Sequence, residues 1–258
     1  MLQGKTALVT GSTSGIGLGI AVALAQQGAK LMLNGFGDVE AALATVRAAR
    51  GGGEVAYHGA DMRKPAEIED LVHQCGQQFG GPDIVVNNAG IQHVALVEDF
   101  PVERWDAIIA INLSSAFHSM RVALPGMKHR GWGRIINIAS VHGLAASAGK
   151  SAYVAAKHGV IGLTRAAALE CARSGVTVNA ICPGWVLTPL VQKQIDARAA
   201  DHGLTNEEAE RQLLAEKEPS LRFTTPEQLA ALALFLCSPA GDNVLGTAWN
   251  MDGGWLAQ

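Results

Sequence analysis

The chain has little charge, few cysteines and no long apolar run. Its four cysteines are widely separated and lack the spacing of metal ligands, so we expect reduced thiols in a cytoplasmic protein and no bound metal. Charged residues make up 17% of the chain and the formal net charge is −3, which provides no basic surface for nucleic acid. No apolar run approaches the roughly 18 residues that cross a bilayer, so we expect no membrane partner. The N-terminus runs directly into a strand-like segment and does not resemble a signal peptide.

Apolar material is plentiful, because hydrophobic residues make up 48% of the 258 residues. That composition supports a sizeable core, and the length suits one large α/β domain. Short apolar segments alternate with longer segments of helical pattern. The expected strands are residues 6–10, 30–34, 54–58, 84–87, 134–138, 176–181 and 247–251. The expected helices are residues 15–27, 39–50, 66–79 and 226–236, a long helix containing Asn112, and a helix starting near Tyr153.

Strands without polar alternation, separated by helices, indicate a parallel sheet that is covered on both faces. Right-handed crossovers then give a doubly wound, Rossmann-type sheet. No repeat or low-complexity linker interrupts the pattern, so we expect one domain over residues 1–258. The irregular, charge-rich segment 185–220 follows the sixth strand, at the sheet edge where such folds bind ligands. We interpret it as a helical lid, although an ordinary solvated helical excursion would have the same composition.

The first strand ends in a glycine-rich bend, residues 10–17 (TGSTSGIG). Glycines allow a sharp turn and a close approach of the backbone to a pyrophosphate, and the next helix presents its N–H groups to that anion. A tight structural turn is the alternative, but the position between a strand and a helix favours a dinucleotide site. The candidate cofactor residues here are Gly11, Thr13, Ser14, Gly15, Ile16 and Gly17.

A second cofactor segment is expected at the end of the fourth strand, where Asn88, Ala89 and Gly90 leave room for a ribose and a ring. Asp61 follows the third strand and could accept a hydrogen bond from an adenine amino group. An aspartate at this position could equally cap the next helix, and the sequence leaves both interpretations open.

Tyr153 and Lys157 are four residues apart on an expected helix and therefore share one face. A phenol has an unperturbed pKa of about 10, and a fixed ammonium beside it favours the phenolate and lowers that pKa. Ser140 ends the fifth strand and could hold a substrate oxygen. Asn112 lies in the middle of an expected helix, where an amide suggests a polar role. A tyrosine–lysine pair alone is common on protein surfaces, but it becomes specific in combination with this serine and the glycine bend.

These motifs resemble the classical short-chain dehydrogenase/reductase family over essentially the whole chain. The resemblance rests on the glycine bend, residues 87–90 (NNAG), Asn112, Ser140, the Tyr153–Lys157 pair and residues 183–184 (PG). It implies a proton relay through Asn112, Ser140, Tyr153 and Lys157, with Lys157 also contacting the nicotinamide ribose. It further implies that Pro183, Gly184, Val186 and Thr188 border the nicotinamide, and that the chain forms a homotetramer through its C-terminal strand and the neighbouring helix.

The resemblance also bears on the choice between NAD and NADP. NADP-dependent members of the family often carry Arg or Lys before the second motif glycine or after the second strand. This chain has Ser14 and residues 34–37 (NGFG) at those places, so no guanidinium can pair with a 2′-phosphate, and Phe36 would crowd it. The aspartate that often selects NAD is missing as well. We therefore expect NAD as the cofactor, on the absence of a cation and the bulk of Phe36.

Several polar residues fall where the nicotinamide end of the site should lie. A histidine and a lysine that supply charge, with two amides that supply fixed donors, suit a small carboxylate, and two tryptophans suit a short alkyl group. Taken singly, each has a simpler explanation as a surface, turn or packing residue. The candidate substrate residues are Gln92, Ser140, His142, Lys150, Tyr153, Trp185, Gln194 and Trp255. Gln192 is an alternative to Gln194 in the lid.

Within the family, these segments resemble the branch that oxidises (R)-3-hydroxybutyrate to acetoacetate. That resemblance implies that Gln92, His142, Lys150 and Gln194 hold the substrate carboxylate. The rival interpretations are a 3-oxoacyl carrier-protein reductase, a polyol dehydrogenase, or a dinucleotide-sensing protein without turnover. A closed, cationic pocket argues against a long thioester substrate, and the retained tyrosine and lysine argue against a sensor.

Overall fold

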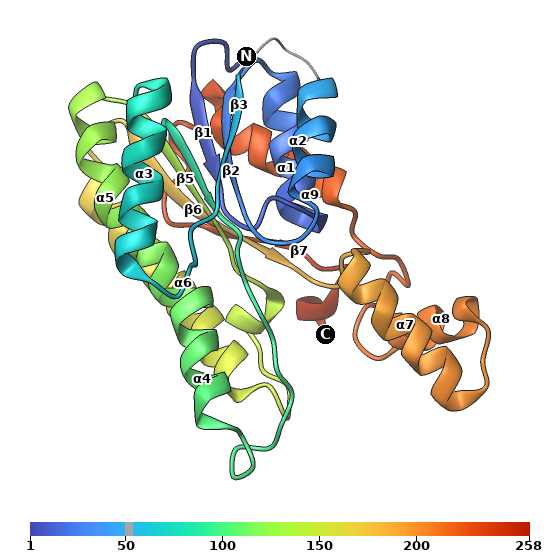
Figure 1. The fold of residues 1–258 in the computed structure, drawn as a ribbon. Helices are drawn as coiled ribbons and strands as arrows, with labels where there is room; N and C mark the ends of the chain where they lie inside the picture. The colour runs from blue at the N-terminus through green and yellow to red at the C-terminus, as the bar shows by residue number, and fades with distance from the viewer. Residues whose placement is uncertain (50–53) are drawn as a thin grey trace.

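The computed structural model describes residues 1–49 and 54–258, and it contains a seven-stranded parallel sheet in the order β3-β2-β1-β4-β5-β6-β7. The sheet twists through the centre of the molecule (Figure 1). The expected doubly wound fold is confirmed. The strands are β1 (Thr6–Val9), β2 (Lys30–Asn34), β3 (Val55–His58), β4 (Ile84–Asn87), β5 (Gly133–Ile138), β6 (Val176–Pro183) and β7 (Ala248–Met251).

Successive residues of each central strand enter different cores, because side chains alternate across a sheet. Val9 joins the core under one helix layer, whereas its neighbour Leu8 joins the core under the other. The first layer consists of α1 (Gly15–Gln26), α2 (Val39–Ala48) and α9 (Pro226–Cys237). The second consists of α3 (Pro65–Phe79), α5 (Ser115–Arg130) and α6 (Ser151–Cys171), on the opposite face (Figure 1). The expected end of α2 at residue 50 lies outside the described residues.

The long helix expected around Asn112 is divided. It consists of α4 (Val102–Ile109), a π-helical turn (Ala110–Ser114) and α5. Such turns widen the hydrogen-bonding pattern for one turn and often occur at functional sites. The expected long helix around Asn112 is therefore confirmed as the continuous segment Val102–Arg130, and the π-helical turn within it was not predicted.

The continuous helical segment Val102–Arg130 bears on the expectation that the chain has no membrane partner. Over an 18-residue window it reaches a mean hydropathy of 1.3, so by length and composition it could cross a membrane. A core helix of a globular protein passes the same test, and Met120, Ala123 and Met127 are buried against the sheet. The segment is thus weak evidence for a membrane.

The lid segment (residues 185–220) is largely helical, as expected. It contains α7 (Pro189–His202) and α8 (Asn206–Ala215), which stand out from the sheet body (Figure 1). Val191, Ile195 and Leu213 form a small core of its own. Thr205 and Glu208 form a capping box that starts α8. The segment is therefore an ordered helical pair; its movement as a lid stays a prediction.

Candidate active site

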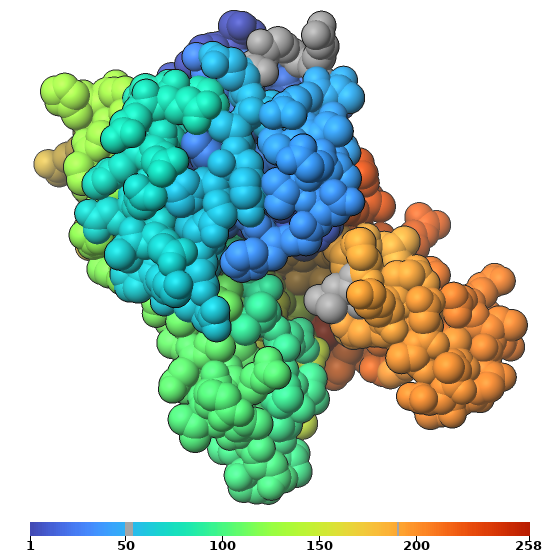
Figure 2. Space-filling view, viewed as in Figure 1, coloured from blue at the N-terminus to red at the C-terminus, as the bar shows by residue number. Residues whose placement is uncertain are grey.

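A cleft of about 440 Å³ opens at the C-terminal ends of the central strands, where open α/β sheets bind ligands. Figure 2 shows the hollow between the sheet body and α7. All the predicted site residues line it except Gly17 and Asn112. Those that do are Gly11, Thr13, Ser14, Gly15, Ile16, Phe36, Asp61, Asn88, Ala89, Gly90, Gln92, Ser140, His142, Lys150, Tyr153, Lys157, Pro183, Gly184, Trp185, Val186, Thr188, Gln194 and Trp255.

The glycine bend is shaped for close backbone approach. A Cβ atom at Gly11 would lie 2.9 Å from Cα of Ala89, and one at Gly17 would collide with the Gly11 carbonyl and the Asn88 amide. Gly17 does not line the cleft, but the absence of a side chain there allows the Gly11 carbonyl and the Asn88 amide to approach the start of α1. Ser14 precedes α1 but makes no side-chain capping bond, so the first-turn N–H groups of α1 have no cap from that side chain. These uncapped donors and the positive helix end fit a dinucleotide pyrophosphate.

Replacing Gly17 by alanine is expected to weaken NADH binding at least tenfold and to destabilise the fold by about 1–3 kcal/mol, because the new methyl group meets backbone that cannot yield. Fluorescence titration with NADH and thermal unfolding measure the two effects. Gly162→Ala in α6 is the matched control, since nothing lies within 4 Å of its Cβ position and helical alanine should stabilise. Unchanged NADH affinity in Gly17→Ala would contradict this role.

Sequence reasoning missed the part that Thr10 plays. Its hydroxyl accepts hydrogen bonds from the backbone N–H groups of Asn88 (3.0 Å) and Ala89 (3.1 Å). The Asn88 amide in turn donates to the carbonyls of Thr10 and Gly11. Thr10 was visible as the first residue of the bend, but its pairing with a segment 78 residues away required the register of β1 and β4.

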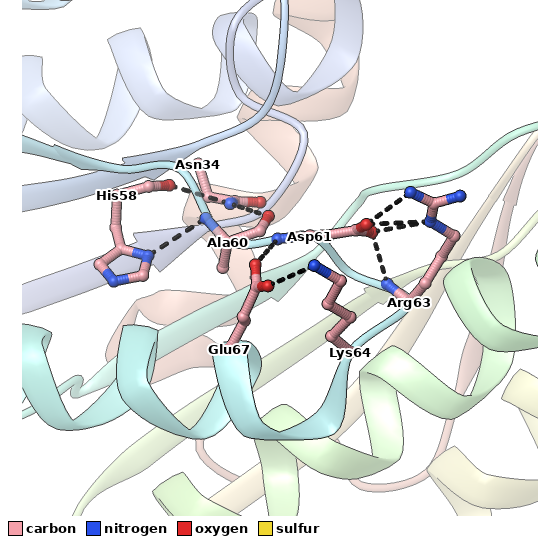
Figure 3. A network of polar contacts seen from close by, with 7 residues as sticks. All are labelled: Asn34, His58, Ala60, Asp61, Arg63, Lys64 and Glu67. Atoms are coloured by element: carbon pink, nitrogen blue, oxygen red, sulfur yellow. Dashed lines mark hydrogen bonds and ion pairs between the residues drawn. The ribbon is translucent and has the colours of Figure 1, made fainter.

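The adenosine end of the cleft contains a polar network around Asp61 (Figure 3). The Asp61 carboxylate accepts from the Arg63 guanidinium, with Nη2 at 2.6 Å, and from the Arg63 backbone N–H at 2.9 Å. The hydrogen bond from the Arg63 side chain is the main reason why the pKa of Asp61 is lowered. Asp61 is not the α3 cap, because Lys64 occupies that position. The helix-cap interpretation is wrong, and an ionised acceptor remains available for an adenine amino group.

Side-chain hydrogen bonds fix the turn at Gly35 and Phe36, which we expect to select between NAD and NADP. Tyr57 donates its hydroxyl to the Gly35 carbonyl at 2.6 Å, and Thr13 donates to the Phe36 carbonyl. Phe36 is 69% exposed and lines the cleft. Among the described residues that line it, the lysines and arginines are Lys150 and Lys157, which flank Tyr153 in sequence at the other end.

Tyr153 and Lys157 lie on α6, as expected, with the Lys157 Nζ atom 5.5 Å from the centre of the tyrosine ring. Lys157 is buried, donates to the Ile138 carbonyl at 2.8 Å, and has its pKa lowered by burial to about 8. The expected lowering of the Tyr153 pKa is not found. Burial raises it, and the contact with Ser140 only partly opposes that rise. Desolvation of the phenol therefore outweighs the effect of the neighbouring lysine on its pKa.

Asn112 does not face the cleft. Its side chain is used in two hydrogen bonds to Ile91, accepting from the N–H and donating to the carbonyl, both at 2.9 Å. A Cβ atom at Gly90 would lie 3.6 Å from the Asn112 oxygen, which is an ordinary contact, so these bonds do not depend on a glycine at that position. Asn112 thus fixes the loop after β4; its membership of a proton relay stays a prediction.

The His142 ring lies beside the rings of Tyr153 and Trp255. Its ring is 5.9 Å from that of Tyr153 and 5.3 Å from that of Trp255, both edge to face. Burial, with Lys150 adding repulsion, lowers the pKa of His142 to about 4. The expectation that His142 supplies positive charge is therefore wrong at neutral pH. It offers a neutral ring whose Nε2 lies 3.0 Å from the Ser147 hydroxyl.

Lys150 remains the cation of the predicted carboxylate clamp. Its ammonium lies 5.5 Å from the centre of the Trp185 ring, and burial lowers its pKa while Glu216 opposes the shift. Gln194 lines the cleft, whereas Gln192 is bonded to Asp196 within α7. Of the two lid amides, the geometry favours Gln194.

No group of three or more histidine, cysteine or acidic side chains suited to a metal ion is found within residues 1–49 and 54–258. The four cysteines are buried and free. The absence of a bound metal stays a prediction.

A doubly wound sheet with a glycine bend after its first strand and a cleft at the carboxyl ends of its strands is typical of dinucleotide-binding enzymes. The family model described as short chain dehydrogenase matches residues 5–199, and the chain belongs to that family. Members of this family bind a nicotinamide dinucleotide.

Individual relatives are similar along their whole length. The chain is 67% identical to a D-beta-hydroxybutyrate dehydrogenase of Cupriavidus necator, with 100% of both chains covered. It is 56% identical to the D-beta-hydroxybutyrate dehydrogenase of Rhizobium meliloti, over 98% of this chain and 99% of the relative. Among solved structures, a variant of actinorhodin polyketide ketoreductase with NADPH superposes with a TM-score of 0.91 at 36% identity, covering 99% of each chain.

Proposed function

We propose that the chain interconverts (R)-3-hydroxybutyrate and acetoacetate with NAD as its cofactor. The observation that carries this proposal is the end of the cleft beside Tyr153, where the Lys150 ammonium lies 5.5 Å from the Trp185 ring and Trp255 packs against His142. The two relatives named as D-beta-hydroxybutyrate dehydrogenases support it. A cation beside two indoles suits a short acid better than a neutral polyol.

The chain's own residues then have distinct tasks. Ser140 holds the substrate oxygen, and the Tyr153 hydroxyl group, as phenolate, removes the proton from the C3 hydroxyl. Lys157 is fixed against the Ile138 carbonyl and stabilises negative charge on Tyr153. When bound, NAD⁺ supplies the hydride acceptor for C3. Positioning of the reactants between the sheet edge and the lid segment contributes much of the rate.

The substrate carboxylate would be held at the other side of the same pocket. Lys150 supplies the charge, while His142, Gln92 and Gln194 supply uncharged polar contacts. Spectrophotometric assay of NADH formation from (R)-3-hydroxybutyrate tests the proposal directly. Turnover of an acetoacetyl thioester with NADPH, and none of the free acid, would overturn it in favour of a ketoreductase.

NAD⁺ should be used at least tenfold better than NADP⁺, measured as kcat/KM. The reason is that no lysine or arginine lines the described adenosine end and Phe36 occupies its mouth. Phe36→Arg should narrow the gap, since a charge-assisted bond to a 2′-phosphate is worth about 1.5–3 kcal/mol. Phe36→Leu is the control, because it removes the ring without adding charge. Equal kcat/KM for both cofactors in the wild type would reject the assignment.

The family resemblance also supports a cytoplasmic homotetramer. Exposed apolar side chains that suit subunit contact include Val94, Val97 and Leu169, which are 62%, 75% and 81% exposed. Light scattering of the purified protein measures the assembly, and a monomer would contradict this part of the proposal.

A further inference from the structure

Glu218 is a buried carboxylate outside the cleft and has no part in the mechanism described above. It follows α8, is 1% exposed, and accepts a hydrogen bond from the backbone N–H of Trp185 through Oε1. Its other oxygen, Oε2, is buried and has no hydrogen-bond partner in the described chain. Burying a carboxylate costs free energy unless the group is hydrogen-bonded and paired with a positive charge.

Three segments meet around this side chain: the end of β6 with the three residues that follow it (residues 183–186), the stalk (residues 217–224) and the C-terminal turn with the last residue of β7 (residues 251–258). Each is bonded to another through backbone groups. The bonds are Gly184 N–H to Met251 O (3.0 Å), Ser220 N–H to Gly253 O (3.0 Å) and Thr224 N–H to Trp185 O (2.9 Å). The Gln258 side chain adds a bond to the Lys217 carbonyl at 3.0 Å.

Two glycines leave room for the carboxylate. A Cβ atom at Gly184 would collide with Glu218 Oε1 and lie 2.9 Å from Cα of Asp252. Gly253 has a φ of 59°, and a Cβ atom there would lie 3.0 Å from Glu218 Oε2. The surrounding backbone is therefore built around this side chain.

The pKa of Glu218 also reflects removal of its carboxyl group from water. Burial raises the pKa of Glu218 to about 7, the bond from Trp185 opposes that rise, and the Asp252 carboxylate adds to it. The end of β6 carries no charged residue. The stalk carries Lys217 and Arg222 besides Glu218, and Glu216 directly precedes it. The acceptor function of the side chain, which an uncharged amide could share, is what the geometry uses.

We propose that Glu218 is a positioning residue that holds the end of β6, the stalk and the C-terminal turn in a fixed arrangement. Gly184, Trp185 and Val186 line the cleft, and so does Trp255 of the C-terminal turn. Glu218 does not line the cleft, but it fixes the position of the end of β6 relative to the C-terminal turn. The inference rests on the proposed function for its substrate readout only.

The test compares three variants. Glu218→Ala removes the acceptor, Glu218→Gln keeps an acceptor of the same shape without charge, and Glu207→Gln is a matched control on an exposed position of α8. Glu218→Ala is expected to raise the NADH dissociation constant about tenfold and to lower kcat/KM for 3-hydroxybutyrate at least tenfold. Glu218→Gln should restore both to within threefold of wild type, and Glu207→Gln should change neither.

NADH binding is measured by fluorescence without substrate, so this arm does not depend on which alcohol is oxidised. If the wild type ignores 3-hydroxybutyrate, the proposed function fails while the binding arm still decides the inference. A purely structural role predicts a lower thermal midpoint in Glu218→Ala with NADH affinity unchanged, and that result would overturn the inference. Should Glu218→Ala not fold, Glu218→Asp, which shortens the reach by one methylene, is expected to show the same loss, and wild-type affinity there would overturn it equally.

Discussion

Replacing Tyr153 by phenylalanine should lower kcat for 3-hydroxybutyrate oxidation by about 10²–10⁴-fold, the usual worth of a positioned acid–base group. The ring would still pack edge to face with His142 at 5.9 Å, so the fold and the cleft should survive. NADH affinity is therefore expected to change little. Steady-state kinetics and fluorescence titration of the same preparation measure both quantities.

Tyr57→Phe is the matched control. That hydroxyl holds the Gly35 carbonyl at the adenosine end, so its loss should affect the KM for the cofactor and leave kcat nearly unchanged. Near-normal kcat in Tyr153→Phe would mean that another group moves the proton. The oxidation rate of the wild type should also rise with pH through the neutral range without levelling off below about 10, the ordinary pKa of a phenol, because burial raises the pKa of Tyr153 and the reaction needs its ionised form.

The methyl ester of 3-hydroxybutyrate should react about 100-fold less efficiently than the acid. Removing the negative charge leaves the Lys150 ammonium unpaired in a half-buried site, and each charge-assisted bond lost costs about 1.5–3 kcal/mol. The neutral state of His142 makes Lys150 the cation on which this discrimination depends. The measurement is kcat/KM for acid and ester.

Lys150→Met should weaken the use of the acid and narrow its advantage over the ester. Lys193→Met, at an exposed position of α7, removes the same charge away from the cleft and should preserve the ratio. An ester that the wild type uses as well as the acid would remove the carboxylate clamp and leave an unspecific dehydrogenase.

Much of the fold was predictable because the buried strands of a parallel sheet are short apolar segments that alternate with helical segments along the sequence. The range of β2 was expected to the residue, and β4 likewise, since both are continuous apolar runs between turn residues. The site followed from the same logic, because the carboxyl ends of parallel strands lie at one edge. Local patterns therefore indicated from the sequence alone that Ser140 and the glycine bend belong to one site.

What could not be predicted depends on three-dimensional surroundings. The π-helical turn at Asn112 has no period of its own in the sequence, and its purpose appears only in the two bonds to Ile91. The directions of the Tyr153 and His142 pKa shifts depend on desolvation, which no spacing reveals. Glu218 looked like one more charge in a polar segment, although its burial sets it apart.

The contact between α1 and α9 has a consequence for how the chain reaches its native state. Helix α1 begins the dinucleotide half, yet its apolar side packs on α9 near the end of the chain, so closely that a Cβ atom at Gly19 would lie 2.7 Å from Pro226. An N-terminal βαβ unit emerging during synthesis would therefore keep an uncovered apolar surface until α9 follows. Non-local closure of this kind slows folding and prolongs exposure to aggregation. The N-terminal unit that contains the glycine bend is therefore synthesised first, but it is fully packed only after α9 has been synthesised.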